Sequence, residues 1–226
     1  MIRAILFDLF GTLVDNMTNA QVSDFRRMTA EALRVPGEEY AKGWAETFTK
    51  RARGEYGSVE NAIRAAAECC ATPYYEDGMK DALAVRRKWM DIWMTPREDA
   101  RVTIVALRKR GMRIGLLSNC SEDVPEMWNT TIFSDIIDEP LFSCSEGLRK
   151  PMPEFYERAL GRLRVDAKDC LYVADGDNGE LAAATKLGMP TVMIRPPHCI
   201  DDFRTHGEDD WSGPRIERLE ELLDLL

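Results

Sequence analysis

The sequence of 226 residues lacks the features that mark several large classes of protein. It has no apolar run of the roughly 20 residues that a membrane-spanning helix needs, and its first residues resemble a short strand rather than a secretory signal. It also lacks a cluster of basic residues, and its net charge of −9 repels nucleic acid and anionic membrane surfaces. We therefore expect a cytoplasmic protein that has neither nucleic-acid nor membrane partners.

The cysteine and histidine patterns of disulfide-rich scaffolds and zinc sites are missing as well. The six cysteines are scattered and form no CxxC pair, which predicts reduced thiols. Cys69 and Cys70 are adjacent, a spacing that rarely suits a disulfide, so we expect them to be buried in a helix. The two histidines, His198 and His206, have no second ligand at a zinc spacing and are given no role.

What the sequence does contain is a regular alternation of short apolar runs with helical patterns. The predicted strands, all short and apolar, cover residues 2–7, 113–117, 141–143, 170–174 and 191–194. The predicted helices of this part of the chain cover residues 98–109, 124–128, 153–163, 180–187 and 216–226. Strands that alternate with helices predict an α/β fold built on a doubly wound parallel sheet.

One long stretch departs from this alternation. Between the first and second predicted strands the apolar residues follow a helical spacing, broken only by glycine and proline. We therefore predict an all-helical domain of residues 16–95, inserted into a core formed by residues 1–15 and 96–226. Trp89 and Trp93 lie four residues apart, which favours packing between helices of this domain over ligand binding.

Polar side chains directly follow three of the predicted strands. Asp8 ends the first strand, Ser118 and Asn119 end the second, and Asp175 ends the fourth. In doubly wound sheets, sites lie beyond the carboxyl ends of the strands. The sequence therefore predicts one site at that edge of the sheet, built from all three loops.

Asp8 has the setting of a nucleophile. The loop after it contains Gly11 and Thr12, and backbone N–H groups there can hold an oxyanion beside the carboxylate. A strand this apolar has little structural reason to end in a buried carboxylate. Ser118 can donate a hydrogen bond to a phosphoryl oxygen, and Lys150 can balance the charge of Asp8 and of a transferring group.

A second acidic group predicts a metal site. Asp175, Asp177 and Glu180 lie within six residues and can converge with Asp8 on one hard cation. A carboxylate that attacks a phosphate dianion meets charge repulsion, which a divalent ion can neutralise. Because oxygen ligands suit magnesium, we predict Mg²⁺ as the cofactor, and leave open whether Asp177 is a ligand.

Four motifs, in this order, resemble those of the haloacid dehalogenase-like (HAD) hydrolase superfamily, in its subgroup with a helical cap. They are residues 7–15 (FDLFGTLVD), residues 117–119 (LSN), residues 149–151 (RKP) followed by Tyr156, and residues 174–180 (ADGDNGE). The resemblance covers nearly the whole chain. It implies a Rossmann-like core, with the helical insertion as a cap that closes over the site and carries selectivity.

The resemblance also implies a role for each matching residue. The implied catalytic residues are Asp8 as nucleophile, with Ser118 and Lys150 stabilising the intermediate. The implied substrate-binding residues are Gly11, Thr12 and Asn119. The implied ligands of Mg²⁺ are Asp8, Phe10 through its backbone carbonyl, Asp175 and Glu180.

Phe10 departs from the family pattern. HAD phosphatases usually carry a second aspartate there as general acid and base, and losing such help costs about 10²–10⁴-fold in rate. An aromatic residue at this place is familiar from haloacid dehalogenases, which need no metal, so a 2-haloacid dehalogenase is the main alternative. Those enzymes have Ser and Asn where this chain has Asp175 and Asp177, and the added negative charge favours metal-dependent chemistry.

Two further alternatives stay open. Without the acid-base residue, the chain could bind a phosphorylated small molecule with weak activity or none. A phosphonatase reaction would need a lysine of the helical domain to form a Schiff base, and Lys42 and Lys50 are candidates. We predict an Mg²⁺-dependent phosphatase that acts on a small phosphate ester through an aspartyl-enzyme intermediate at Asp8, and make no prediction of its oligomeric state.

Overall fold

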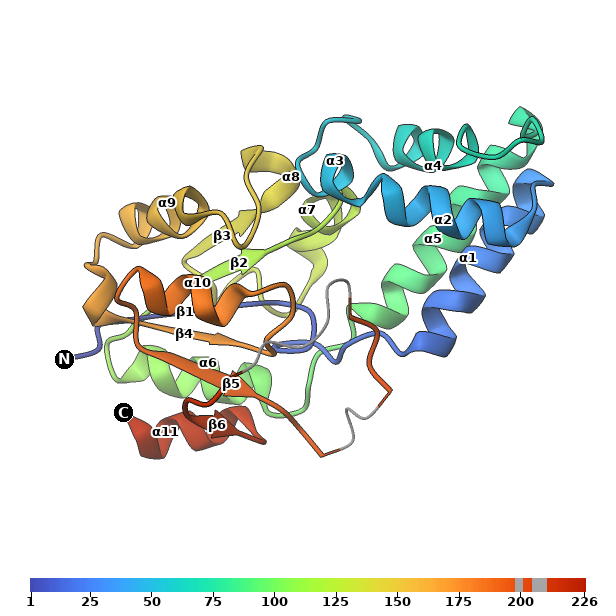
Figure 1. Cartoon of the computed structure of the whole chain (residues 1–226). Helices are drawn as coiled ribbons and strands as arrows, with labels where there is room; N and C mark the ends of the chain where they lie inside the picture. Colours follow the sequence, from blue (N-terminus) through green and yellow to red (C-terminus); the bar gives the residue numbers. More distant parts are fainter. Residues whose placement is uncertain (198–200, 205–210) are drawn as a thin grey trace.

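A computed structural model describes residues 1–197, 201–204 and 211–226, and centres on a six-stranded sheet (Figure 1). The strands are β1 (Ala4–Phe7), β2 (Arg113–Ser118), β3 (Glu139–Phe142), β4 (Cys170–Ala174), β5 (Thr191–Ile194) and β6 (Arg215–Ile216). Their order in the sheet is β3-β2-β1-β4-β5-β6, and every neighbouring pair is parallel. The predicted parallel sheet is therefore confirmed.

The central strands of the sheet are buried on both faces because nearly all of their side chains are apolar. In β1, Ile5 and Phe7 pack into one hydrophobic cluster, and Ala4 and Leu6 pack into a second cluster on the opposite face. The helices α9 (Pro153–Leu163) and α10 (Glu180–Lys186) contribute to the second cluster. The other face is covered by α6 (Ala100–Lys109) and the C-terminal α11 (Leu222–Leu225) (Figure 1).

The strand order places the three predicted site loops side by side. β1 lies between β2 and β4, with Phe7 paired to Leu116 on one side and to Val173 on the other. Each of these strands ends within two residues of that level, so the loops that begin at Asp8 and at Asp175 leave the sheet together. The site residues converge because of this topology.

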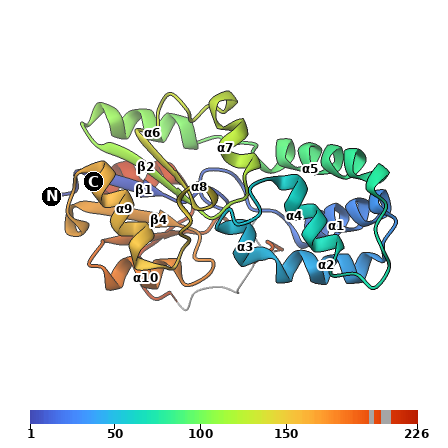
Figure 2. The same cartoon turned by 90° about the horizontal axis from the view of Figure 1, so that it is seen from above.

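A group of helices between β1 and β2 lies beyond the carboxyl ends of the strands, at the end of the molecule away from both termini (Figures 1 and 2). We call residues 19–93 the helical segment. Its elements are α1 (Asn19–Leu33), α2 (Gly37–Glu46), α3 (Phe48–Ala52), α4 (Val59–Ala67), η1 (Glu76–Gly78) and α5 (Met79–Trp93). A reciprocal capping box between Thr18 and Gln21 starts α1. The segment contains no strand, as predicted.

Aromatic residues form the centre of the helical segment. Phe25 meets the rings of Trp44 and Trp93 edge-on, with ring centroids 5.3 and 5.5 Å apart. The contact of Trp93 on α5 with Phe25 on α1 is packing between helices, as predicted for Trp93, and Trp93 also lines the cavity described below. Trp89 lies 5.6 Å from Trp93 on the same helix. The remaining short helices, all in the core, are α7 (Asp123–Met127), η2 (Trp128–Thr130), α8 (Ser143–Glu146), η3 (Ala167–Asp169) and η4 (Leu219–Glu221).

The prediction of one terminal helix over residues 216–226 was wrong. Ile216 instead pairs with Ile194 as part of β6, which extends the sheet by one strand. The Glu221 carboxylate then accepts hydrogen bonds from the backbone N–H groups of Glu217 and Arg218, so helical structure begins only at Leu219. Ile216 fits the apolar spacing of a helix, but it pairs with the edge strand of the sheet instead.

The cysteine predictions had mixed outcomes. The described cysteines are free thiols, as predicted. Cys69 is exposed and Cys70 is half-buried, and both follow the end of α4, so their expected burial in a helix was wrong. Cys199, His198 and His206 lie outside the described residues.

Within the described part of the chain, none of the helices has both the length and the apolar character that crossing a membrane requires.

Two glycines test how tightly the helical segment rests on the core. Gly54 and Gly57 have similar positive φ angles, +69° and +72°. A Cβ at Gly54 would overlap the carbonyl oxygen of Cys144, whereas a Cβ at Gly57 would meet nothing within 4 Å. We expect Gly57→Ala to cost about 1 kcal/mol for the left-handed conformation, and Gly54→Ala to cost about 1–3 kcal/mol more. Urea denaturation measures both, and equal losses would contradict the close contact.

Candidate active site

Asp8 is buried at the point where β1 ends. Its backbone N–H continues the ladder by donating to the carbonyl of Val173, and its side chain accepts a hydrogen bond from the ammonium of Lys150. The loop that follows turns tightly, because the N–H groups of residues 12–14 all donate to the carbonyl of Leu9. Asp8 is 6% exposed, so its carboxylate opens to solvent only through the adjoining cavity.

Gly11 is needed in this loop for two reasons. Its φ of +77° lies in the left-handed region, which a side chain disfavours. A Cβ at this position would also overlap the carboxylate of Asp175. Its bare backbone therefore lets the Asp8 loop press directly against the second acidic loop. The substrate-binding role of Gly11 stays a prediction.

Lys150 is held by two asparagines through its backbone. The amide oxygen of Asn119 accepts from the Lys150 N–H at 2.8 Å, and the amide nitrogens of Asn119 and Asn178 donate to the Lys150 carbonyl at 3.1 and 2.9 Å. The ammonium then reaches the carboxylates of Asp8 and Glu180, with 2.6 Å to the latter. Asn119, which was predicted to bind substrate, lines the cavity, but both its amide oxygen and its amide nitrogen hydrogen-bond to the backbone of Lys150.

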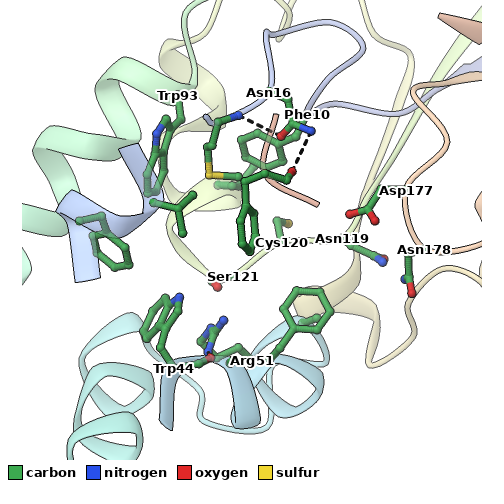
Figure 3. A pocket seen from close by; sticks show the side chains of 18 of the residues that line it. Phe10, Asn16, Trp44, Arg51, Trp93, Asn119, Cys120, Ser121, Asp177 and Asn178 are labelled. Atoms are coloured by element: carbon green, nitrogen blue, oxygen red, sulfur yellow. Dashed lines mark hydrogen bonds between the residues drawn. The ribbon is translucent and has the colours of Figure 1, made fainter. Parts of the chain in front are cut away.

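Glu180 and Asp175 complete the acidic group. Glu180 is 1% exposed, and its carboxylate accepts from Lys150, from the Tyr172 hydroxyl at 2.6 Å and from the Gly176 N–H at 3.2 Å. Asp175 is 3% exposed and accepts from the N–H of Asp177 at 3.3 Å. Asp177 lines the cavity, as Figure 3 shows.

Two residues that the sequence prediction missed bind Asp175. The Asn16 amide donates to one of its oxygens at 3.3 Å, and the Arg204 guanidinium forms an ion pair with the same oxygen, also at 3.3 Å. The segment that carries Arg204 is held against the core because the Phe203 N–H donates to the Met17 carbonyl. Neither residue belongs to a motif, so only the folded chain could identify them.

The electrostatics follow from burying three carboxylates with two cations. Burial raises the pKa of the Asp8 carboxyl to about 7, against the attraction of Lys150, and Glu180 adds to the rise. Burial, and next the charge of Glu180, also raise the pKa of Asp175 well above its usual range. Burial alone would lower the pKa of Lys150, but the attraction of Asp8 and Glu180 outweighs it and raises that pKa. The site is therefore short of positive charge.

The acidic side chains fit a magnesium ion. Asp8, Asp175 and Glu180 are buried and each offers one carboxylate oxygen within 4.8 Å of the others. Opposite ligands of an octahedral Mg²⁺ lie about 4.2 Å apart, so small side-chain shifts would bring the three into range. Phe10, the fourth predicted ligand through its carbonyl, lies in the same loop as Asp8, and its side chain lines the cavity (Figure 3).

The two hydroxyl groups that were predicted to contact the substrate, those of Ser118 and Thr12, are buried. Ser118 and Thr12 are both 0% exposed, and neither hydroxyl hydrogen-bonds to an oxygen or nitrogen of the described residues. Neither residue is among those that line the cavity, so their contacts with a substrate stay predictions. Lys42 and Lys50 lie on the exposed surface of the helical segment and do not line the cavity.

A cavity of about 530 Å³ joins the acidic site to the helical segment. Figure 3 shows Asn119, Asp177 and Asn178 on its core side, and Trp44 and Arg51 on the side of the helical segment. The apolar part of its wall is rich in aromatic and methionine side chains. This composition suits an organic substrate that presents an anionic group to the core.

The match to known proteins agrees with this geometry. A family model described as haloacid dehalogenase-like hydrolase matches residues 2–188. The protein therefore belongs to the haloacid dehalogenase-like hydrolases, which confirms the resemblance seen in its motifs.

The similar proteins include both phosphatases and dehalogenases. The glyceraldehyde 3-phosphate phosphatase of Pyrococcus abyssi is 24% identical over 230 residues, which cover 100% of this chain and 94% of that protein. The (S)-2-haloacid dehalogenase 4A of Burkholderia cepacia is 28% identical over 204 residues, covering 85% and 83%. The solved structure of a 2-haloacid dehalogenase from Pseudomonas syringae has a TM-score of 0.66 at 18% identity, with 100% of this chain and 98% of that one covered. This structural likeness shows the fold alone.

The raised pKa of Asp8 predicts how stability changes with pH. Because its folded pKa of about 7 lies above the usual 3.8, the folded state binds this proton more tightly than the unfolded chain, and stability falls as pH rises between these values. Asp8→Asn removes that loss. In metal-free buffer we expect the variant to exceed the wild type by up to a few kcal/mol near pH 8 and to match it near pH 4. Urea denaturation tests this, and a difference independent of pH would contradict it.

Proposed function

We propose that the protein is an Mg²⁺-dependent phosphatase that acts on a small phosphate ester through an aspartyl-enzyme intermediate at Asp8. The observation that carries this proposal is the buried trio of Asp8, Asp175 and Glu180, whose oxygens converge although Lys150 and Arg204 supply too little positive charge for them. A dehalogenase has no use for this acidity. A phosphatase uses it to gather a cation.

In this mechanism the free oxygen of Asp8 attacks phosphorus, the P–O bond to the ester oxygen breaks, and a phosphoaspartate forms. The alcohol leaves as its anion and takes a proton from water. Water then attacks that phosphoaspartate and releases inorganic phosphate and the Asp8 carboxylate. Lys150 favours the ionised form of Asp8 and offsets charge on the transferring group. The hydroxyls of Ser118 and Thr12 would donate to phosphoryl oxygens. Mg²⁺, when bound by Asp8, Asp175 and Glu180, supplies the charge that makes attack on a dianion feasible.

Phe10 limits the rate that this site can reach. Its side chain lines the cavity where a phosphatase usually places a proton donor for the leaving oxygen. Loss of that donor costs about 10²–10⁴-fold with poor leaving groups. Esters of acidic alcohols or phenols need less protonation, so they should be the better substrates.

A 2-haloacid dehalogenase is the second candidate, and Phe10 together with the Burkholderia cepacia relative favours it. In that reaction Asp8 would displace halide, which needs no proton. The acidic Asp175 and Asp177 beside Asp8 argue against it, since they would repel the carboxylate of a haloacid. A third possibility, a protein that binds a phosphorylated ligand with little turnover, leaves the buried Asp8 without a purpose.

The proposal includes the domain arrangement and the location. Residues 16–95 would form a cap that closes over the site, and residues 1–15 and 96–226 the catalytic core. The substrate would be a small molecule. The scattered, unpaired cysteines favour a cytoplasmic location, where thiols stay reduced.

The test is hydrolysis of p-nitrophenyl phosphate by the purified protein. We expect phosphate release with Mg²⁺, loss of activity in chelator, and a loss of at least about 10³-fold in Asp8→Asn. Asp24→Asn, which removes an exposed aspartate on α1, is the matched control and should keep wild-type activity. Release of halide from 2-chloropropionate in chelator, without phosphatase activity, would replace this proposal with dehalogenation.

A further inference from the structure

The helical segment brings an excess of positive charge to the wall of the cavity. Arg26, Arg51 and Arg86 come from three different helices and all line the cavity. Arg86 is paired with Asp123 at 2.5 Å. Arg26 and Arg51 form no ion pair with a carboxylate among the described residues. Neither of these two guanidinium groups therefore has a carboxylate within ion-pair distance among the described residues, although Asp123 attracts Arg51 from farther away.

Arg51 is the more informative of the two because it is almost completely buried. Arg51 is 5% exposed. Burial, followed by the charge of Arg86, lowers the pKa of its guanidinium to about 9. Burying a charge without an opposite charge is costly. No carboxylate of the described residues lies within ion-pair distance of Arg51, so a bound anionic ligand is the natural counter-ion.

The geometry of Arg51 is fixed from one side only. One terminal nitrogen donates to the Trp44 carbonyl at 2.5 Å and to the Thr47 hydroxyl at 2.6 Å, and the guanidinium stacks 3.7 Å above the Trp44 ring. The other terminal nitrogen and Nε have no hydrogen bond among the described residues. Figure 3 shows the group pointing from α3 into the cavity. The free edge is the planar fork that binds a carboxylate through two parallel hydrogen bonds.

We propose that Arg51, assisted by Arg26, binds a carboxylate of the substrate remote from the reacting phosphate, so that the protein selects phosphate esters of carboxylic acids. This inference rests on the proposed function and names its substrate class. A carboxylate fits better than a second phosphate, because stripping water from a dianion costs more beside Trp44 and Phe48. The aromatic and methionine walls then contact the carbon skeleton between the two anionic groups.

The kinetic test compares phenyl phosphate with 4-carboxyphenyl phosphate, which adds only the carboxylate. We expect the wild type to prefer the carboxylated ester, and Arg51→Met to lower its kcat/KM by about 10²-fold while changing that of phenyl phosphate by less than about threefold. Arg27→Met, which removes an exposed arginine on α1, is the matched control and should keep the wild-type preference. Taking ratios between the variants cancels the difference in leaving group.

A binding test separates this inference from the proposed function. Calorimetric titration with benzylphosphonate and 4-(phosphonomethyl)benzoate needs no turnover, so it decides the matter even if neither ester is hydrolysed. We expect the carboxylated ligand to bind the wild type at least about 10-fold more tightly, and Arg51→Met to bind both alike. Equal affinities and equal kcat/KM values in the wild type would overturn the inference.

Thermal unfolding distinguishes ligand binding from a structural role of Arg51. Removing an unpaired buried charge should leave the midpoint of Arg51→Met unchanged or raise it. A lowered midpoint, together with parallel losses on both esters and both phosphonates, would show that Arg51 only supports the fold. Arg51→Lys keeps the charge without the planar fork, and we expect it to restore part of the preference for the carboxylated ligands.

Discussion

Three carboxylates that lie buried within 4.8 Å of one another must be held by positive charge, and much of the structure serves that requirement. Mutual repulsion in a place with little water would otherwise force them to take up protons or to separate. Lys150 and Arg204 each neutralise part of the group. Both cations reach the site from loops far from Asp8 in the sequence, so the acidic group can exist only in the folded chain.

The parallel sheet makes this arrangement possible. With β1 between β2 and β4, the loops that begin at Asp8, Asn119 and Asp175 leave adjacent strands at one edge. Gly11 lets two of these loops touch, and the asparagines at 119 and 178 fix the backbone of Lys150 between them. Polar groups that first suggest substrate contacts thus build the framework of the site. The charge deficit that remains is what a divalent ion would offset.

The helical segment has the opposite balance of charge. Its arginines gather around the aromatic cluster of Phe25, Trp44 and Trp93, whereas the core edge is acidic. The cavity therefore joins a region short of cations to a region short of anions. Such a field orients an asymmetric ligand and excludes the reversed orientation. In the proposed function, selectivity and chemistry are thus supplied by different parts of the chain.

The sequence predicted the residues whose position follows from strand ends, and missed those that depend on tertiary contact. Asp8 and Asp175 directly follow apolar strands, and Glu180 begins the helix that follows Asp175, so both the fold and their convergence could be inferred. Arg204 and Arg51 belong to no pattern, because their meaning comes only from what they face. The terminal helix was misjudged for the same reason: nothing in the periodicity of residues 216–226 reveals that Ile216 completes the sheet.

The most direct test of the central claim is the number of protons released when Mg²⁺ binds. Near pH 6, below its pKa of about 7, Asp8 is mostly protonated in the metal-free protein, and a cation that binds the ionised carboxylate must displace that proton. Calorimetric titrations in two buffers of different ionisation enthalpy give the count. We expect the wild type to release about one proton or more per bound ion, and Asp8→Asn to release about one proton fewer. Mg²⁺ binding without proton release, or no binding at millimolar Mg²⁺, would contradict it.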